Sequence, residues 1–96
     1  MNPFFDELGE RLREAGARRG VRIAAPQLSP RLAEELLELA RVAAHTRERR
    51  FAPLASFLAG EATERLRAAG LEEEAVVDAL REVRRELETA ASEAGS

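Results

Sequence analysis

The sequence predicts an all-α fold in the form of a small antiparallel four-helix bundle. Apolar residues recur at spacings of three and four in four successive segments, which places them on one face of a helix in each segment. Prolines and glycines stand at the boundaries of these segments, where helices begin and end. The chain has 96 residues, of which 45% are hydrophobic and 34% charged, as is typical of one globular domain. We therefore expect residues 1–96 to form a single helical domain.

The first helix is predicted over residues 3–19. Asn2 suits the N-cap position, and Pro3 suits the first helical position, where its missing N–H would be unpaired in any case. Gly20 follows two arginines and suits the C-cap. The apolar residues that share one face of this helix are Phe5, Leu8, Leu12 and Ala15.

A connector over residues 21–28 separates the first two helices, and Pro26 prevents it from being helical. Its apolar residues, which we expect to pack on the bundle, are Val21, Ile23 and Leu28. The second helix is predicted over residues 30–46, after the start signal Ser29-Pro30. Because it carries two adjacent apolar stripes, we expect it to be the most buried helix. The first stripe contains Leu32, Leu36, Leu39 and Ala43, and the second contains Ala33, Leu37, Ala40 and Ala44.

The third helix is predicted over residues 53–69, and Gly70 ends it. Its inward-facing residues are predicted to be Leu54, Phe57, Leu58, Ala62, Leu66 and Ala69. Gly60 stands in the middle of this helix, where glycine costs about 1 kcal/mol relative to alanine. We expect close approach of a neighbouring helix to compensate, with a backbone opened for a ligand as the alternative. The phenylalanines, predicted to lie in the core, are Phe4, Phe5, Phe51 and Phe57.

The fourth helix is predicted over residues 72–91, with three glutamates at its positive N-terminal end. Its apolar stripe contains Val76, Leu80, Val83, Leu87 and Ala90. A three-helix core with a loosely docked fourth helix is the structural alternative.

Exposed ion pairs four residues apart are expected along the helices, and these are Glu7–Arg11, Glu14–Arg18, Glu61–Arg65 and Arg84–Glu88.

The turn between the second and third helices concentrates positive charge. Its candidate ligand-binding or partner-binding residues are His45, Arg47, Arg49 and Arg50. One interpretation is an anion or phosphoryl site that combines these arginines with the exposed amides at the start of the third helix. The other is a solvated turn whose arginines offset helix carbonyls and neighbouring glutamates. The second interpretation is favoured, because exposed arginines are common and no glycine-rich cradle is present.

Several function classes lack support in the sequence. There is no cysteine and only one histidine, and Glu-x-x-His is absent because Val42 occupies the acidic position, so no metal or other cofactor is predicted. No serine has a plausible base, so we expect the protein not to be an enzyme. The net charge of −3 and the absence of Trp and Tyr argue against nucleic-acid binding. No apolar run of about 20 residues and no leader segment is found, so a cytoplasmic protein without membrane contact is expected.

The segment 36–62 resembles a small, uncharacterised bacterial helical domain. The matching residues are Leu39-Ala40-Arg41, Ala44-His45, Arg49, Ala52-Pro53-Leu54, Phe57-Leu58 and Gly60. Members of that family stand alone or are fused to domains similar to the nucleotidyltransferases that make molybdopterin guanine dinucleotide. This chain departs from the pattern in a more highly charged turn at Arg47, Glu48 and Arg50 and in a longer connector.

The resemblance implies a non-catalytic accessory or interaction module linked to molybdenum-cofactor maturation. Its expected partner is a protein, either a nucleotidyltransferase or a molybdoenzyme maturation factor. The alternative function is binding of a small anionic ligand, such as a nucleotide or an oxyanion, at the arginine-rich turn 47–50.

Overall fold

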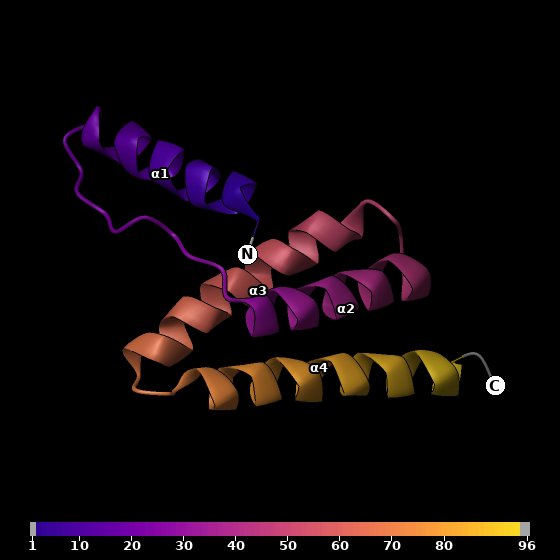
Figure 1. The fold of residues 1–96 in the computed structure, drawn as a ribbon. Coiled ribbons are helices and arrows are strands. Elements are labelled where there is room, and N and C mark those ends of the chain that lie inside the picture. The colour runs from indigo at the N-terminus through magenta and orange to yellow at the C-terminus, as the bar shows by residue number, and fades with distance from the viewer. Residues whose placement is uncertain (1, 95–96) are drawn as a thin grey trace. The chain divides into compact units, whose positions relative to one another are not determined.

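A computed structural model describes residues 2–94 of the chain (Figure 1). It contains four helices and, within those residues, no strand: α1 (Pro3–Ala17), α2 (Pro30–Thr46), α3 (Phe51–Ala68) and α4 (Glu73–Ala94). The all-α class predicted from the sequence is therefore confirmed. The chain divides into two compact units, one up to Pro30 and the other from Arg31 onward.

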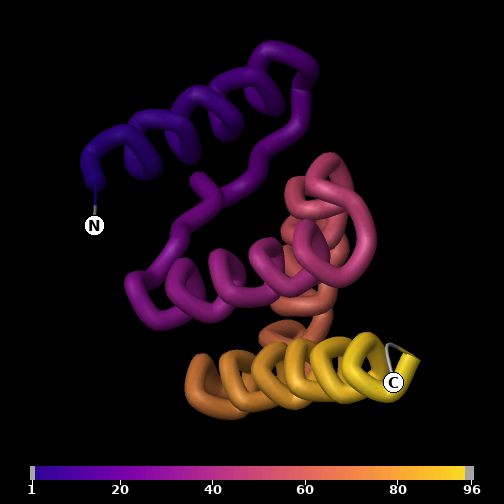
Figure 2. The backbone as a smooth tube through the Cα atoms, turned by 90° about the vertical axis from the view of Figure 1, so that its right-hand side faces the viewer, coloured from indigo at the N-terminus to yellow at the C-terminus, as the bar shows by residue number. Residues whose placement is uncertain are grey.

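The first unit consists of α1 and the connector that follows it. Asn2 caps α1 as predicted, because its side-chain oxygen accepts a hydrogen bond from the amide of Phe4 at 2.9 Å. The helix ends at Ala17, and the chain turns at Gly20, whose φ of 78° suits glycine. The connector then runs back along α1 (Figure 2).

Two glycines of α1 allow the connector backbone to approach closely. A Cβ on Gly9 would collide with the carbonyl oxygen of Pro26, and one on Gly16 would lie 3.2 Å from the carbonyl oxygen of Val21. Gly9 and Gly16 are seven residues apart and so share one face of the helix. The connector's Val21 and Ile23 are 54% and 45% exposed, and the expectation that its apolar residues pack on the bundle stays a prediction.

The two phenylalanines of this unit were predicted to lie in the core. Phe4 and Phe5 are both exposed, and their rings lie edge to face with centroids 5.2 Å apart. The larger residues of the predicted stripe, Leu8 and Leu12, are exposed as well. The residue of α1 that is buried is Gly9, which lies under the connector.

The second unit contains α2, α3 and α4, which alternate in direction (Figure 1). Its core is formed by Leu32, Leu39, Val42 and Ala43 of α2, by Ala59 and Thr63 of α3, and by Val76, Val77 and Leu80 of α4. As predicted, α2 has the largest number of buried residues among the described helices. The second predicted stripe of α2 does not lie wholly inside, because Leu37 is 71% exposed.

The fourth helix belongs to this unit, but only the first half of its predicted stripe is buried. Val76 and Leu80 lie in the core, whereas Val83 and Leu87 are 45% and 37% exposed. The helix begins at Glu73, after Gly70 has turned the chain with a φ of 102°. All four predicted pairs of charges four residues apart are present as ion pairs, although Arg84, at 16% side-chain exposure, is not the exposed residue that was predicted.

The third helix is rotated relative to the sequence-based prediction. Leu54, Phe57 and Leu58 were expected to face inward, but they are 61%, 65% and 65% exposed. The buried positions of α3 are instead Ala59 and Thr63. Gly60 makes no close contact, because a Cβ built there would meet no atom within 4 Å. The predicted helix contact at Gly60 is therefore wrong.

Candidate interaction surface

Three large apolar side chains of α3 are exposed rather than buried. We refer to Leu54, Phe57 and Leu58 as the α3 face. They are separated by three and four residues, so they lie together on one side of the helix. Each is more than 60% exposed, and together they present an apolar patch on the order of a few hundred Å².

The opposite side of α3 explains why these residues are outside. Ala59 and Thr63 are 7% and 2% exposed, and both have small side chains. The hydroxyl of Thr63 donates a hydrogen bond to the carbonyl oxygen of Ala59 at 2.8 Å, so its burial leaves no unpaired polar group. Small residues let the helix axis lie close to its neighbours. Leucine or phenylalanine at the two buried positions would need more space than alanine and threonine occupy and would lead to overpacking.

Charged residues border the α3 face at both ends. At the N-terminal end, Arg50 precedes Leu54 by four residues and its side chain is 82% exposed. At the C-terminal end, Glu61 and Arg65 form an ion pair with a distance of 3.4 Å. An apolar centre with a charged rim is the usual anatomy of a protein–protein interface.

The sequence-predicted site residues lie at the N-terminal end of this face. His45 is exposed in the last turn of α2, and Arg47, Arg49 and Arg50 are exposed in the turn that follows. Arg50 donates from Nε to Oε2 of Glu48 at 2.8 Å. The guanidinium groups of Arg47 and Arg49 have no ion-pair partner within residues 2–94.

The start of α3 does not supply the amides that an anion cradle needs. The amide of Phe51 donates to the carbonyl of Glu48 at 2.9 Å, and that of Ala52 donates to the carbonyl of Arg49 at 3.2 Å. Pro53 has no N–H. The three first residues of α3 therefore offer no free donor, and an anion at this turn would be held by arginine side chains alone.

A buried ionic cluster joins α2 to α4, and sequence analysis missed it. Glu35 is 5% exposed, and its Oε1 accepts a hydrogen bond of 2.6 Å from Nε of Arg84. Nε of Arg81 lies 3.7 Å from the other oxygen of Glu35. The hydrogen bond to Glu35 raises the pKa of Arg84 above its usual range. The sequence did contain a signal for the burial of Glu35. This residue lies three positions after Leu32 and four before Leu39, which places its carboxylate in the buried stripe of α2.

This ionic cluster lines a hollow of about 290 Å³ between α2 and α4. The lining residues are Arg31, Glu34, Glu35, Glu38, Val77, Arg81 and Arg84. Three arginines face three glutamates, so the hollow carries no net charge that would attract an ion. Arg31 is itself paired with Glu74 across the two helices. We therefore assign the cluster a structural role, as a link that sets the register of α2 against α4.

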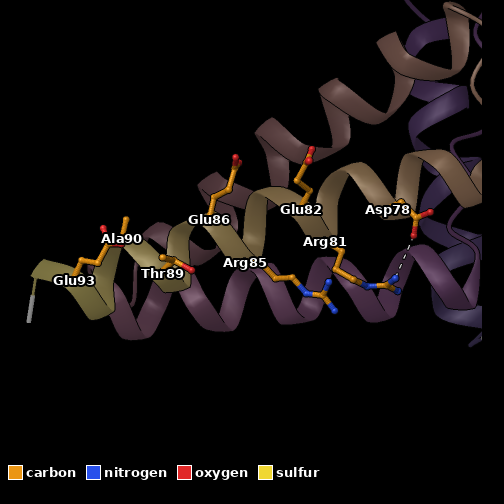
Figure 3. Close-up of a pocket in the computed structure, with 8 residues that line it drawn as sticks. All are labelled: Asp78, Arg81, Glu82, Arg85, Glu86, Thr89, Ala90 and Glu93. Atoms are coloured by element: carbon orange, nitrogen blue, oxygen red, sulfur yellow. Dashed lines mark hydrogen bonds and ion pairs between the residues drawn. The ribbon is translucent and has the colours of Figure 1, made fainter.

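A larger hollow of about 660 Å³ lies along the outer surface of α4 (Figure 3). Its lining residues are Asp78, Arg81, Glu82, Arg85, Glu86, Thr89, Ala90 and Glu93. All of them belong to one helix, with Arg81 and Arg85 on one side and Glu82 and Glu86 on the other. A single helix cannot enclose a ligand, so this is a solvated charged face rather than a binding pocket.

Within residues 2–94, no group of three or more His, Cys, Asp or Glu side chains is placed to hold a metal ion. No helix in that range combines the length and the apolar character required to cross a membrane.

Comparison with known proteins supplies one match. A family model described as "Domain of unknown function (DUF6457)" matches residues 1–95. No curated protein and no solved structure matches the chain. Because the family model spans nearly the whole sequence, the chain belongs to the DUF6457 family of domains of unknown function.

Proposed function

We propose that the protein is a non-catalytic interaction module that docks onto a larger protein through the α3 face. One observation carries this proposal: α3 directs Ala59 and Thr63 inward, while Phe57 and Leu58 are each 65% exposed. Contiguous exposed apolar patches bordered by polar residues mark interaction sites in soluble proteins. Burial of each such side chain on binding would contribute roughly 1.5–3 kcal/mol.

The resemblance noted in the sequence supports the choice of this surface. Its matching segment, residues 36–62, includes Leu54, Phe57 and Leu58, which have no core role to account for their presence. The resemblance also suggests the partner. In this proposal the module acts in the cytoplasm in molybdenum-cofactor maturation, and its partner is a nucleotidyltransferase-like protein or a molybdoenzyme maturation factor.

Site-specific photocrosslinking tests the proposal. A photoreactive amino acid is placed at position 58 and, as a matched control, at Leu37, which is 71% exposed on α2. Proteins crosslinked from position 58 but not from position 37 are identified and purified. Their binding to the full chain, to Leu58→Ser and to Leu37→Ser is then measured by calorimetry.

The proposal predicts a purified partner that binds the wild-type chain and Leu37→Ser alike but binds Leu58→Ser at least about tenfold more weakly. The melting temperature of Leu58→Ser should stay within a few degrees of the wild-type value. A complex that is insensitive to Leu58→Ser would contradict docking through the α3 face. If the reconstituted partner belongs to neither expected class, the link to the molybdenum cofactor fails while docking stands.

A second candidate function is binding of a small anion at the turn 47–50. The observation that favours it is the exposure of Arg47 and Arg49 without an ion-pair partner within the described part of the chain. Thermal shift measurements with phosphate, nucleotides and molybdate test it, because a ligand that binds only the folded state raises the melting temperature. No shift with any of these anions would exclude this candidate.

A further inference from the structure

The charge around the α3 face specifies what kind of partner fits it. We propose that the occupant is an amphipathic helix whose apolar stripe is followed by acidic residues at the end that meets the turn 47–50. This inference rests on the proposed docking function and adds the chemistry of the partner's contact segment.

The segment around the face is positively charged in a chain that is negatively charged overall. Residues 47–67 contain five arginines and three glutamates, a formal charge of +2, whereas the whole chain carries −3. Two of the glutamates, Glu61 and Glu64, already pair with Arg65 and Arg67 on the same helix. The positive excess is therefore located at the N-terminal end of the α3 face.

The arginines at that end can form further hydrogen bonds and ion pairs. Arg47 and Arg49 have no ion-pair partner within residues 2–94, and Arg50 meets only Glu48, in a pair whose side chains are 82% and 51% exposed. A guanidinium group binds a carboxylate through two parallel hydrogen bonds, so these side chains select a partner with aspartate or glutamate. Desolvation at the edge of an apolar contact would strengthen those bonds.

The shape of the surface suits a helix. Arg50, Leu54, Leu58 and Arg65 follow one side of α3, and the interval from residue 50 to residue 65 spans about 22 Å at 1.5 Å per residue. A helix of three to four turns matches that length and presents anchors at i, i+3, i+4 and i+7. Gly60, three residues beyond Phe57, has open space where a Cβ would stand, which lets a partner side chain approach the backbone.

Charge and polarity also argue against two other occupants. Two copies of this chain paired through their α3 faces would bring two segments of charge +2 together, which costs energy. A nucleic acid would satisfy the arginines but would leave Leu54, Phe57 and Leu58 without an apolar partner. An acidic amphipathic helix complements both the arginines and the apolar side chains.

A display experiment tests the proposal with the full chain as bait. The library presents helices with a fixed leucine stripe at i, i+3, i+4 and i+7, and the positions flanking the stripe vary among Glu, Gln and Lys. Binders are selected on the wild-type chain, with removal of those that also bind Leu58→Ser. The affinities of individual binders are then measured against Arg49→Ala/Arg50→Ala. Arg85→Ala serves as the matched control, since Arg85 is an exposed arginine on α4.

The proposal predicts that glutamate is enriched at one flank of the selected helices. Each binder should lose about tenfold or more in affinity on Arg49→Ala/Arg50→Ala and should be unaffected by Arg85→Ala. Binders that depend on Leu58 but show no preference for glutamate would overturn the acidic-helix proposal while leaving docking intact. Failure to recover any Leu58-dependent binder, or dimerisation of the chain that Leu58→Ser abolishes, would also overturn it.

Discussion

Nε of Arg84 lies 2.6 Å from Oε1 of Glu35, although the two residues are 49 positions apart in the sequence. Glu35 belongs to α2 and is 5% exposed, and the side chain of Arg84 on α4 is 16% exposed. The pair joins the two helices that run in the same direction within the second unit (Figure 1). A charge this deeply buried needs its partner, so the pair constrains how α2 and α4 align.

Removal of Arg84 should therefore destabilise the fold. Arg84→Ala leaves the carboxylate of Glu35 buried beside a weaker partner, Arg81, and we expect a loss on the order of 3 kcal/mol in the free energy of unfolding. Urea denaturation measures it, with Arg85→Ala as the exposed control on the same helix. The double variant Glu35→Leu/Arg84→Leu should recover most of the loss. Equal stability of Arg84→Ala and Arg85→Ala would show that the pair has no structural role.

Two glycines should respond to alanine in opposite directions. Gly60→Ala places a methyl group in open space and removes glycine from a helix interior, so we expect a gain of about 0.5–1 kcal/mol in the free energy of unfolding. Gly9→Ala drives a methyl group into the carbonyl oxygen of Pro26 and should destabilise the α1–connector unit by about 1–3 kcal/mol.

Amide hydrogen exchange distinguishes the two glycine variants by location. Gly9→Ala should speed exchange within α1, whereas Gly60→Ala should slow it within α3. Destabilisation by Gly60→Ala would place a neighbouring group against that position and would contradict the orientation of α3.

Leu80 provides a reference for true core burial. It is 5% exposed on α4, so Leu80→Asp should unfold the second unit, because an unpaired carboxylate cannot be buried there. Loss of the far-ultraviolet circular dichroism signal of helix at 25 °C checks this expectation. A folded Leu80→Asp variant with unchanged melting temperature would mean that α4 is not docked.

The arginines of the turn should contribute little to stability. Arg50 and Glu48 are mostly exposed, and ion pairs of this kind contribute at most about 1 kcal/mol. We expect Arg49→Ala/Arg50→Ala to melt within a few degrees of the wild-type chain in differential scanning calorimetry. A drop of many degrees would make the arginines structural and would remove them as candidates for partner or anion binding.

The sequence allowed the helices themselves to be predicted because caps and periodicity agree along the chain. Asn2, Gly20 and Gly70 occupy the turn or cap positions assigned to them, and α2 spans the predicted residues. The start of α3 was placed two residues late. Backbone bonds from the amides of Phe51 and Ala52 begin the helix before Pro53.

The orientation of α3 could not be predicted in the same way. One side of α3 carries large apolar side chains and the other carries small residues such as Ala59 and Thr63, so both are compatible with burial. Hydrophobicity alone favours the leucine side, whereas the residues of α3 that are buried are Ala59 and Thr63. Glu35 was missed for a related reason: glutamate is usually exposed, and only its long-range partner Arg84 makes burial possible.

The exposure of the α3 face in the folded chain is the claim on which the functional proposals depend, and the stability of Leu54→Ser/Leu58→Ser tests it most directly. Because both leucines are more than 60% exposed, the free energy of unfolding from urea denaturation should change by less than about 1 kcal/mol. If both leucines were buried in a core, their truncation to small residues would instead lower the free energy of unfolding by at least about 4 kcal/mol. A loss of that size would show that these side chains are already covered in the free protein, and it would contradict docking through the α3 face.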